Sequence, residues 1–392
     1  MAKRNLCKKL TAMALCLCSI TAVSACGGGE SSSMSSIVES STGITMTVSV
    51  AQQPVSLATD AVKNYLSADS ERIVTEFLPD GEYRDDQGVP LLLECDFTAQ
   101  DSAPAVKQVT AEFSFTEDFS VIEQTTTFRG KARKLRIYNL QTSGKTYYYR
   151  VTASLEDGNA VVETGTLQIA PSPRMLYLEG ASNVRDIGGW KTQDGKTIKQ
   201  GVLYRGSEID GGKNTGHPDF CLTEAGIEQL RALGIKTDFD LRSESVKVSE
   251  FSALGADVTR NFYDAAQYEA ILQAGNAERT RRIFSDLANP AAYPVYLHCT
   301  HGVDRAGSTV LILQALLGVE KADLIREYEL SAFYYNYRHV QRNTYTGGNV
   351  LTLLQGLEGY AGETLAEKTA NFLLDIGVTQ SEIDTLRGIF LE

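Results

Sequence analysis

One short segment combines a cysteine with an arginine six positions later, a spacing that suits chemistry on a phosphate group. Cys299 and Arg305 enclose five residues, and a short apolar run that ends at His298 precedes them. A mostly apolar helix is predicted to follow over 308–317. A tight turn that feeds a helix N-terminus presents unpaired N–H groups and a partial positive charge to an anion. The pattern therefore predicts a phosphate-binding turn over 299–305.

A cysteine at the base of such a turn is predicted to act as a nucleophile. The positive surroundings favour the thiolate form of Cys299, which can attack phosphorus and form a covalent phosphocysteine. Arg305 can hold two phosphoryl oxygens in a bidentate fork. This route needs no metal and no cofactor, so neither is expected.

The elements that must position this turn belong to the second half of the chain. From about residue 175 helical and strand patterns alternate, which predicts an α/β domain over 173–392 with a mostly parallel central sheet flanked by helices. Short β-rich runs with turn signals between them precede it and predict a small all-β sandwich over 44–172, clearest from about residue 85. Residues 60–66 are predicted to form a short helix, to which no function is assigned.

Five ordered blocks of the α/β region resemble the cysteine-dependent protein-tyrosine phosphatase superfamily. These blocks are residues 182–190, 194–195, 201–207, 233–242 and 298–307. They are similar to a bacterial branch of secreted protein-tyrosine/serine phosphatases, whose loop reads HCxxGKDRTG where this chain reads HCTHGVDRAG. The resemblance implies hydrolysis of phosphomonoesters, with phosphotyrosine first and phosphoserine or phosphothreonine as further substrates. A phosphorylated protein or a small phosphomonoester would be the partner.

The resemblance also implies roles for individual residues. Cys299 would be the nucleophile, Arg305 would bind the phosphate, and Asp304 would be the general acid and base. His298 would orient the loop through hydrogen bonds. The backbone N–H groups that line the phosphate would be those of Thr300, His301, Gly302, Val303, Asp304 and Arg305.

Other charged residues in the blocks keep alternative readings open. Asp264 and Asp240 are rivals for the role of general acid. Asp240 and Arg242 are also expected to form a structural ion pair that braces the site. Arg185 and Asp186 fit either a buried pair or a loop that contacts the substrate.

Two loop residues, Ala306 and Val303, depart from the pattern of the branch, and His301 stands at one of its variable positions. Ala306 replaces a hydroxyl residue that would stabilise the departing thiolate, which predicts slower hydrolysis of phosphocysteine unless Ser308 substitutes for it. Val303 replaces a lysine and removes one cation from the site. His301 could supply part of that charge at low pH, although an exposed and inert histidine is the stronger expectation.

The start of the chain has the features of an export signal. Residues 1–25 carry four cations and no acid, with an apolar run from Leu10 to Val23, and they end at a Ser-Ala-Cys sequence that looks like a bacterial lipobox. Cys26 is therefore the predicted site of lipidation, followed by a Gly- and Ser-rich flexible tether over 26–43. The protein is expected to be exported and anchored by lipid to the outer face of a bacterial membrane.

Composition and the β-rich region limit the range of partners. The formal net charge of −12 argues against nucleic-acid binding. Residues 140–151 resemble a corner of fibronectin type III modules, although the proline of that motif is absent. The resemblance covers about 85–172 and implies a spacer or a module that contacts protein or carbohydrate.

Two other functions remain open at this point. A phosphoinositide or inositol-phosphate phosphatase would use the same loop, although Val303 counts against a polyanionic substrate. A non-catalytic phosphate-binding or adhesion lipoprotein gains some support from Ala306. The intact set of Cys299, Asp304 and Arg305 argues against that second alternative.

Overall fold

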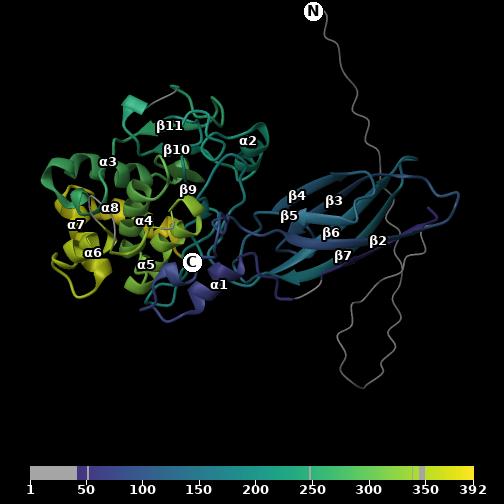
Figure 1. The fold of residues 1–392 in the computed structure, drawn as a ribbon, viewed down its shortest axis with the longest axis horizontal. Coiled ribbons are helices and arrows are strands. Elements are labelled where there is room, and N and C mark those ends of the chain that lie inside the picture. The colour runs from purple at the N-terminus through teal and green to yellow at the C-terminus, as the bar shows by residue number, and fades with distance from the viewer. Residues whose placement is uncertain (1–41, 51–52, 247–248, 338, 344–348) are drawn as a thin grey trace, which may run out of the picture. The chain divides into compact units, whose positions relative to one another are not determined.

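The structure is a computed structural model that describes residues 42–50, 53–246, 249–337, 339–343 and 349–392. The predicted signal segment, Cys26 and nearly all of the predicted tether lie outside these described residues. No helix within the described ranges is both long and apolar enough to cross a membrane. Figure 1 shows the described elements along the chain.

Two antiparallel sheets form the β-rich part of the chain (Figure 1). In spatial order, the first contains β1 (Ile44–Ser49), β2 (Leu91–Ala99) and β5 (Lys134–Ile137), and the second contains β4 (Gln124–Arg129), β3 (Val106–Ser114), β6 (Thr146–Leu155) and β7 (Ala160–Gln168). Side chains along β2 alternate between buried and exposed, as expected for strands with one face on a core. The predicted β-rich character is confirmed, whereas the fibronectin likeness stays a prediction.

A five-stranded sheet lies at the centre of the α/β part. Its strand order is β11 (Thr259–Phe262), β10 (Thr237–Asp240), β12 (Val295–His298), β9 (Leu203–Gly206) and β8 (Arg185–Asp186). The pairs among the first four strands are parallel, and β8 is antiparallel to β9. Every residue of the three inner strands is buried, which is typical of a parallel sheet covered on its faces.

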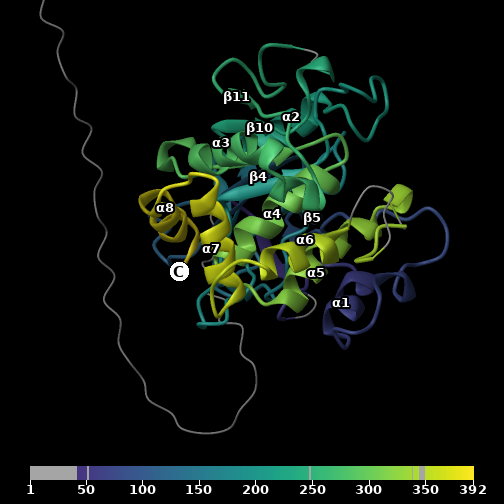
Figure 2. The ribbon, with the colours of Figure 1, turned by 90° about the vertical axis from the view of Figure 1, so that its left-hand side faces the viewer.

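Helices surround this sheet and supply most of the apolar core (Figure 2). They are α2 (Glu224–Arg231), α3 (Ala277–Leu287), α4 (Asp304–Leu316), α5 (Lys321–Glu329), α6 (Val350–Glu358), α7 (Leu365–Asp375) and α8 (Gln380–Phe390). Short 3-10 helices include η1 (Val74–Glu76), η3 (Tyr268–Leu272) and η6 (Leu330–Phe333). α4 packs against β12, α5 and α7. The predicted mixture of sheet and helices is confirmed.

The helix after the cysteine turn begins earlier than the sequence suggested. The apolar run predicted a start at Ser308, but α4 begins at Asp304 with Val303 as its N-cap. The carbonyl of Val303 accepts a hydrogen bond from the N–H of Gly307 at 2.9 Å, which closes the first turn. Asp304 and Arg305 therefore stand in the first helical turn and not in the preceding loop.

The chain between β1 and β2 leaves the sandwich and packs into the α/β core. This connecting segment (residues 53–90) contains α1 (Asp60–Ser67), which begins after the N-cap Thr59. Val62, Tyr65 and Val74 are buried in the same apolar cluster as α4, α5 and α7. The sequence grouped these residues with the sandwich, because a local pattern does not indicate which distant surface an amphipathic helix will cover.

Candidate active site

The loop that carries Cys299 runs between β12 and α4. Cys299 itself is buried and follows His298, which lies level with Gly206 on the neighbouring strand. Gly302 has a φ of +72°, and a Cβ atom there would come within 2.4 Å of the carbonyl group of Gly206. Glycine is therefore required at this point of the loop for both its backbone conformation and its lack of a side chain.

The carbonyl groups of the loop are held from outside. The N–H of Glu208 donates to Thr300 at 3.0 Å, Nδ2 of Asn183 to His301 at 3.1 Å, and Nη2 of Arg205 to Gly302 at 2.5 Å. In a trans peptide the carbonyl and the following N–H point in opposite directions. The N–H groups after these carbonyls therefore face the interior of the loop. None of the N–H groups from 300 to 305 donates to another residue in the described part of the chain.

Arg305 is the last residue of this run. Its side chain is half-buried, and it forms no ion pair or hydrogen bond with any other described residue. Most other buried or half-buried arginines of this part of the chain pair with carboxylates, as Arg242 does with Asp240 at 2.7 Å. A cation and several N–H groups that lack protein partners favour the binding of an anion inside the loop.

Asp304 is held by a pair of tyrosines. The hydroxyl of Tyr268 donates to Oδ1 of Asp304, and the hydroxyl of Tyr328 lies 2.7 Å from that of Tyr268. Burial, with the neighbouring Tyr328 and Asp304, raises the pKa of Tyr268 far above its usual value, so Tyr268 stays protonated and can donate. Oδ2 of Asp304 has no hydrogen bond to another described residue.

The two rivals of Asp304 lie in different surroundings. Asp264 is exposed and pairs with Arg279 at 3.3 Å. Asp240 is buried and accepts hydrogen bonds from Arg242 and Arg260, each at 2.7 Å. Burial would raise the pKa of Asp240, but the charge on His298 and the hydrogen bonds from the two arginines hold it far below its usual value. A carboxyl group held ionised in this way has no proton to give.

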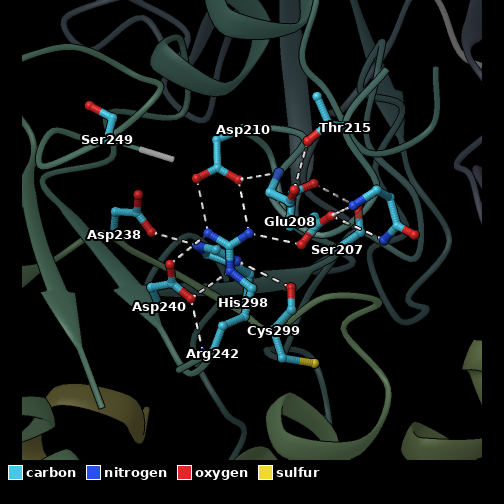
Figure 3. A network of polar contacts seen from close by, with 12 residues as sticks. Ser207, Glu208, Asp210, Thr215, Asp238, Asp240, Arg242, Ser249, His298 and Cys299 are labelled. Atoms are coloured by element: carbon cyan, nitrogen blue, oxygen red, sulfur yellow. Dashed lines mark hydrogen bonds and ion pairs between the residues drawn. The ribbon is translucent and has the colours of Figure 1, made fainter. Parts of the chain in front are cut away.

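Arg242 lies at the centre of a buried network of charges, with His298 and Cys299 close by (Figure 3). Its guanidinium contacts Oε2 of Glu208 at 2.8 Å, Oδ1 of Asp210 at 2.9 Å and Oδ2 of Asp240 at 2.7 Å. Burial alone would lower the pKa of Arg242, but hydrogen bonds and attraction from Asp240 and Asp210 raise it well above its usual value. The expected pairing of Arg242 with Asp240 is thus one contact of a larger network.

His298 connects this network to the nucleophile. Its Nε2 lies 2.9 Å from Oδ1 of Asp238, and its Nδ1 lies 3.2 Å from the carbonyl oxygen of Cys299. Burial opposes the charged ring, but the carboxylates of Asp240 and Asp238 raise the pKa of His298 overall. A protonated ring would donate from both nitrogens, one to Asp238 and one to the backbone of the loop.

Arg185 and Asp186 do not pair with each other, because successive side chains of β8 point to opposite faces. Arg185 pairs with Glu327 of α5 at 2.7 Å, and Asp186 pairs with Arg174 at 3.1 Å. Glu327 also pairs with Arg205 at 3.0 Å. Arg185, Arg205 and Glu327 are all buried.

Sequence reasoning assigned no role to Arg205, Glu327 or Tyr268. An arginine inside the otherwise uncharged strand 203–206 was the one available signal, since a buried charge needs a partner. Glu327 and Tyr268 gave none, because their partners lie 36 to 142 positions away.

The residues that depart from the branch have clear surroundings. Val303, which stands where the branch has a lysine, is buried in the apolar cluster. His301 is half-buried, with its ring centre 5.3 Å from that of Phe220 and 4.9 Å from that of Tyr337. The expectation of an exposed histidine was therefore wrong, and burial lowers the pKa of His301.

Ser308 does not replace the hydroxyl that Ala306 lacks. Its Oγ donates to the carbonyl of Asp304 at 2.7 Å and accepts from the N–H of Tyr268 at 2.8 Å. The Ser308 hydroxyl is therefore committed to α4 and η3. Among the described residues, no group of three or more His, Cys, Asp or Glu side chains is arranged to hold a metal ion.

Comparisons with known proteins point to one family. The model of the tyrosine phosphatase family matches residues 176–392. A protein of Cupriavidus necator, provisionally named a tyrosine-protein phosphatase, is 30% identical to this chain over 192 residues. These residues cover 43% of this chain and 65% of that protein. A tyrosine-protein phosphatase of Nostoc commune is 28% identical over 134 residues, covering 29% of this chain and 46% of that protein. The chain thus spans less than two thirds of the length of these curated relatives. Because the family model covers more than half of its residues, the chain belongs to the tyrosine phosphatase family.

Proposed function

We propose that the chain hydrolyses phosphomonoesters through a covalent phosphocysteine, with phosphotyrosine in proteins as the preferred substrate. The observation that carries this proposal is the Cys299 loop. Its N–H groups from 300 to 305 and the guanidinium of Arg305 have no partner within the described chain, and they directly follow one buried cysteine in the sequence. A phosphoryl group is the ligand that satisfies these donors together.

In the first step the thiolate of Cys299 attacks phosphorus on the side opposite the ester oxygen. A sulfur–phosphorus bond forms and the bond from phosphorus to the ester oxygen breaks. Asp304 gives the proton from Oδ2 to the departing oxygen. The loop N–H groups and Arg305 donate hydrogen bonds to the other three oxygens and stabilise the negative charge on them.

In the second step water attacks the phosphorus of phosphocysteine and the sulfur leaves as thiolate. Asp304, now ionised, takes a proton from the attacking water. Ala306 offers no hydroxyl to the departing sulfur, and the hydroxyl of Ser308 is committed elsewhere. We therefore expect the second step to limit turnover for substrates with good leaving groups.

The loop favours a substrate with one phosphate. Val303 is buried among apolar side chains, and the lowered pKa of His301 keeps its ring neutral at pH 7. Neither residue supplies the additional cation that would favour a phosphoinositide. Activity on phosphoserine and phosphothreonine is part of the proposal as a weaker reaction, because alkyl oxygens are poorer leaving groups than a phenolate.

The remaining parts of the proposal concern location and rest on the sequence. Export through the signal of residues 1–25, lipidation of Cys26 and a tether over 26–43 would place the enzyme on the outer face of a bacterial membrane. The sandwich would act as a spacer or as a module that contacts protein or carbohydrate. Lipid labelling of the full chain and of Cys26→Ser tests the anchor, because only the unaltered chain should take up the label.

A phosphate-release assay tests the catalytic proposal. The full chain should hydrolyse an aryl phosphate in the presence of a metal chelator, and Cys299→Ser should abolish turnover. Cys221→Ser is the matched control, because Cys221 is an exposed free cysteine that forms no part of the loop. Activity that survives in Cys299→Ser would refute the mechanism. A panel of phosphotyrosine, phosphoserine and inositol phosphates then orders the substrates, and preference for inositol phosphates would overturn the proposed specificity.

A further inference from the structure

The connecting segment (residues 53–90) contacts residues that hold the Cys299 loop, although it lies outside the residues that match the family model. Arg84 forms an antiparallel bridge with Tyr334, and Asp86 contacts Asn183. We propose that Arg84 and Asp86 are positioning residues for the phosphate-binding loop, an inference that rests on the proposed function. The tyrosine phosphatase site of this chain is then completed by residues that precede most of its β sandwich.

Asp86 fixes the backbone at Asn183. It is fully buried, its Oδ1 accepts from Nε of Arg84 at 3.0 Å, and its Oδ2 accepts from the N–H of Asn183 at 2.6 Å. Asn183 has a φ of +54°, a region that few residues other than glycine adopt and that asparagine tolerates best. A charged acceptor on its N–H therefore holds this residue in one conformation.

Asn183 passes that constraint to the loop. Its Nδ2 donates to the carbonyl of His301 at 3.1 Å, and its Oδ1 accepts from Nη1 of Arg185 at 2.5 Å, which fixes the amide orientation. Because the carbonyl of His301 points outward to Asn183, the N–H of Gly302 points inward to the phosphate. Asp86 is thus two hydrogen bonds away from an N–H that would bind substrate.

Arg84 is linked to the same part of the loop through a group of aromatic residues. It donates to Oδ1 of Asp219 at 2.7 Å, and its guanidinium lies 4.8 Å from the ring centre of Tyr334. The hydroxyl of Tyr334 also donates to Asp219. Phe220, the residue after Asp219, packs its ring against His301. Arg84 and Asp86 therefore act on His301 by two separate routes.

The connecting segment is also attached at a second place, which provides a matched control. The hydroxyl of Tyr65 donates to Glu329, and Arg342 donates to the carbonyls of Ser70 and Arg72, each at 2.9 Å. None of these contacts involves Asn183 or residues 299–305. Tyr65→Phe therefore weakens the attachment of the segment without breaking the chain of hydrogen bonds to the loop.

The experiment compares Asp86→Asn with Tyr65→Phe in the full chain. Tungstate binding is measured by calorimetry on the Cys299→Ser background, and kcat/KM for an aryl phosphate and the melting temperature are measured with Cys299 present. We expect Asp86→Asn to weaken tungstate binding and to lower kcat/KM by about ten- to a hundredfold, since small displacements at a reacting centre have large effects. Tyr65→Phe should lower the melting temperature while both site measurements change less than about threefold.

Arg84→Gln is the second variant, for use if Asp86→Asn does not fold. It should weaken tungstate binding in the same direction. The inference is overturned if a folded Asp86→Asn or Arg84→Gln matches Tyr65→Phe in both site measurements. Tungstate binding separates this outcome from failure of the proposed function. If the chain binds tungstate but shows no turnover, the proposed function is refuted. Tungstate binding by Asp86→Asn then still decides the positioning role. A chain that does not bind tungstate refutes both.

Discussion

The hydroxyl of Tyr268 donates a hydrogen bond to Oδ1 of Asp304, the first residue of α4. This contact occupies one oxygen of the carboxyl group and leaves the other without a hydrogen bond to a described residue. Tyr268 is itself held by Tyr328 and by the hydrogen bond from its N–H to Ser308. The orientation of the proposed general acid is therefore set by η3 and α5, two elements outside the loop.

Tyr268→Phe should lower activity in a way that depends on the leaving group. Without the hydroxyl, the carboxyl group of Asp304 can rotate, so protonation of the leaving oxygen becomes less efficient. We expect kcat/KM, which reports the first step, to fall about tenfold on phenyl phosphate and to change little on 4-nitrophenyl phosphate, whose leaving group needs no proton. Tyr263→Phe, which removes a hydroxyl bonded to Asp286, is the control. An equal loss on both substrates would instead indicate a general structural defect.

Gly302→Ala should remove activity, and Gly195→Ala should not. Both glycines have positive φ, +72° and +86°, so each substitution carries a backbone strain of about 1–2 kcal/mol. Only at Gly302 does the new Cβ also meet the carbonyl of Gly206, whereas nothing lies within 4 Å at Gly195. Thermal unfolding should show a loss of stability in both variants. Retained kcat/KM in Gly302→Ala would contradict the loop geometry.

Glu327→Gln should destabilise the fold strongly. The carboxylate of Glu327 neutralises the buried guanidiniums of Arg185 and Arg205, and removal of one partner from a buried ion pair costs about 3–5 kcal/mol. The control is Glu358→Gln in the next helix, because its ion pair with Lys321 is exposed and should be worth at most about 1 kcal/mol. Urea denaturation measures both changes in the free energy of unfolding, and similar values for the two variants would refute the role of Glu327.

His298 and His301 should titrate on opposite sides of the usual histidine pKa of about 6.5. Burial opposes protonation of both rings, but Asp240 and Asp238 raise the pKa of His298, whereas the pKa of His301 is lowered. The protonated form of His298 therefore stabilises the fold fully below about pH 6.5, and this contribution is lost as the pH rises through its folded-state pKa. NMR titration of the ring protons measures the pKa of each histidine. Asp238→Asn should lower the pKa of His298 and so reduce the difference between the two values.

A chemistry for the loop could be proposed from the sequence because its candidate residues lie close together in the chain. Cys299, Asp304 and Arg305 lie within seven residues, and the strand before them and the helix after them have strong apolar patterns. The same reasoning placed the start of α4 four residues too late, because it followed apolar side chains. The first hydrogen bond of the helix joins the N–H of Gly307 to the carbonyl of Val303. Asp304 and Arg305 are therefore polar residues of its first turn.

The residues that support the loop could not be found in this way. Arg205, Glu327 and Asp86 contact partners between 97 and 142 positions away, and no local pattern encodes such distances. A buried charge in a strand indicates that some partner exists, but not which one. The path of the connecting segment is a similar case, because its helix is amphipathic and would fit many surfaces.

The position of α1 has a consequence for the order of events during synthesis. The contact between Tyr65 and Glu329 joins residues 264 positions apart, so the apolar face of α1 has no permanent cover until α5 has been made. Contacts of such long range form late, because a large loop must close before they are gained. The sandwich strands on either side of the connecting segment can pair long before that. A nascent chain would thus carry a paired sandwich while the apolar face of α1 is still exposed to solvent.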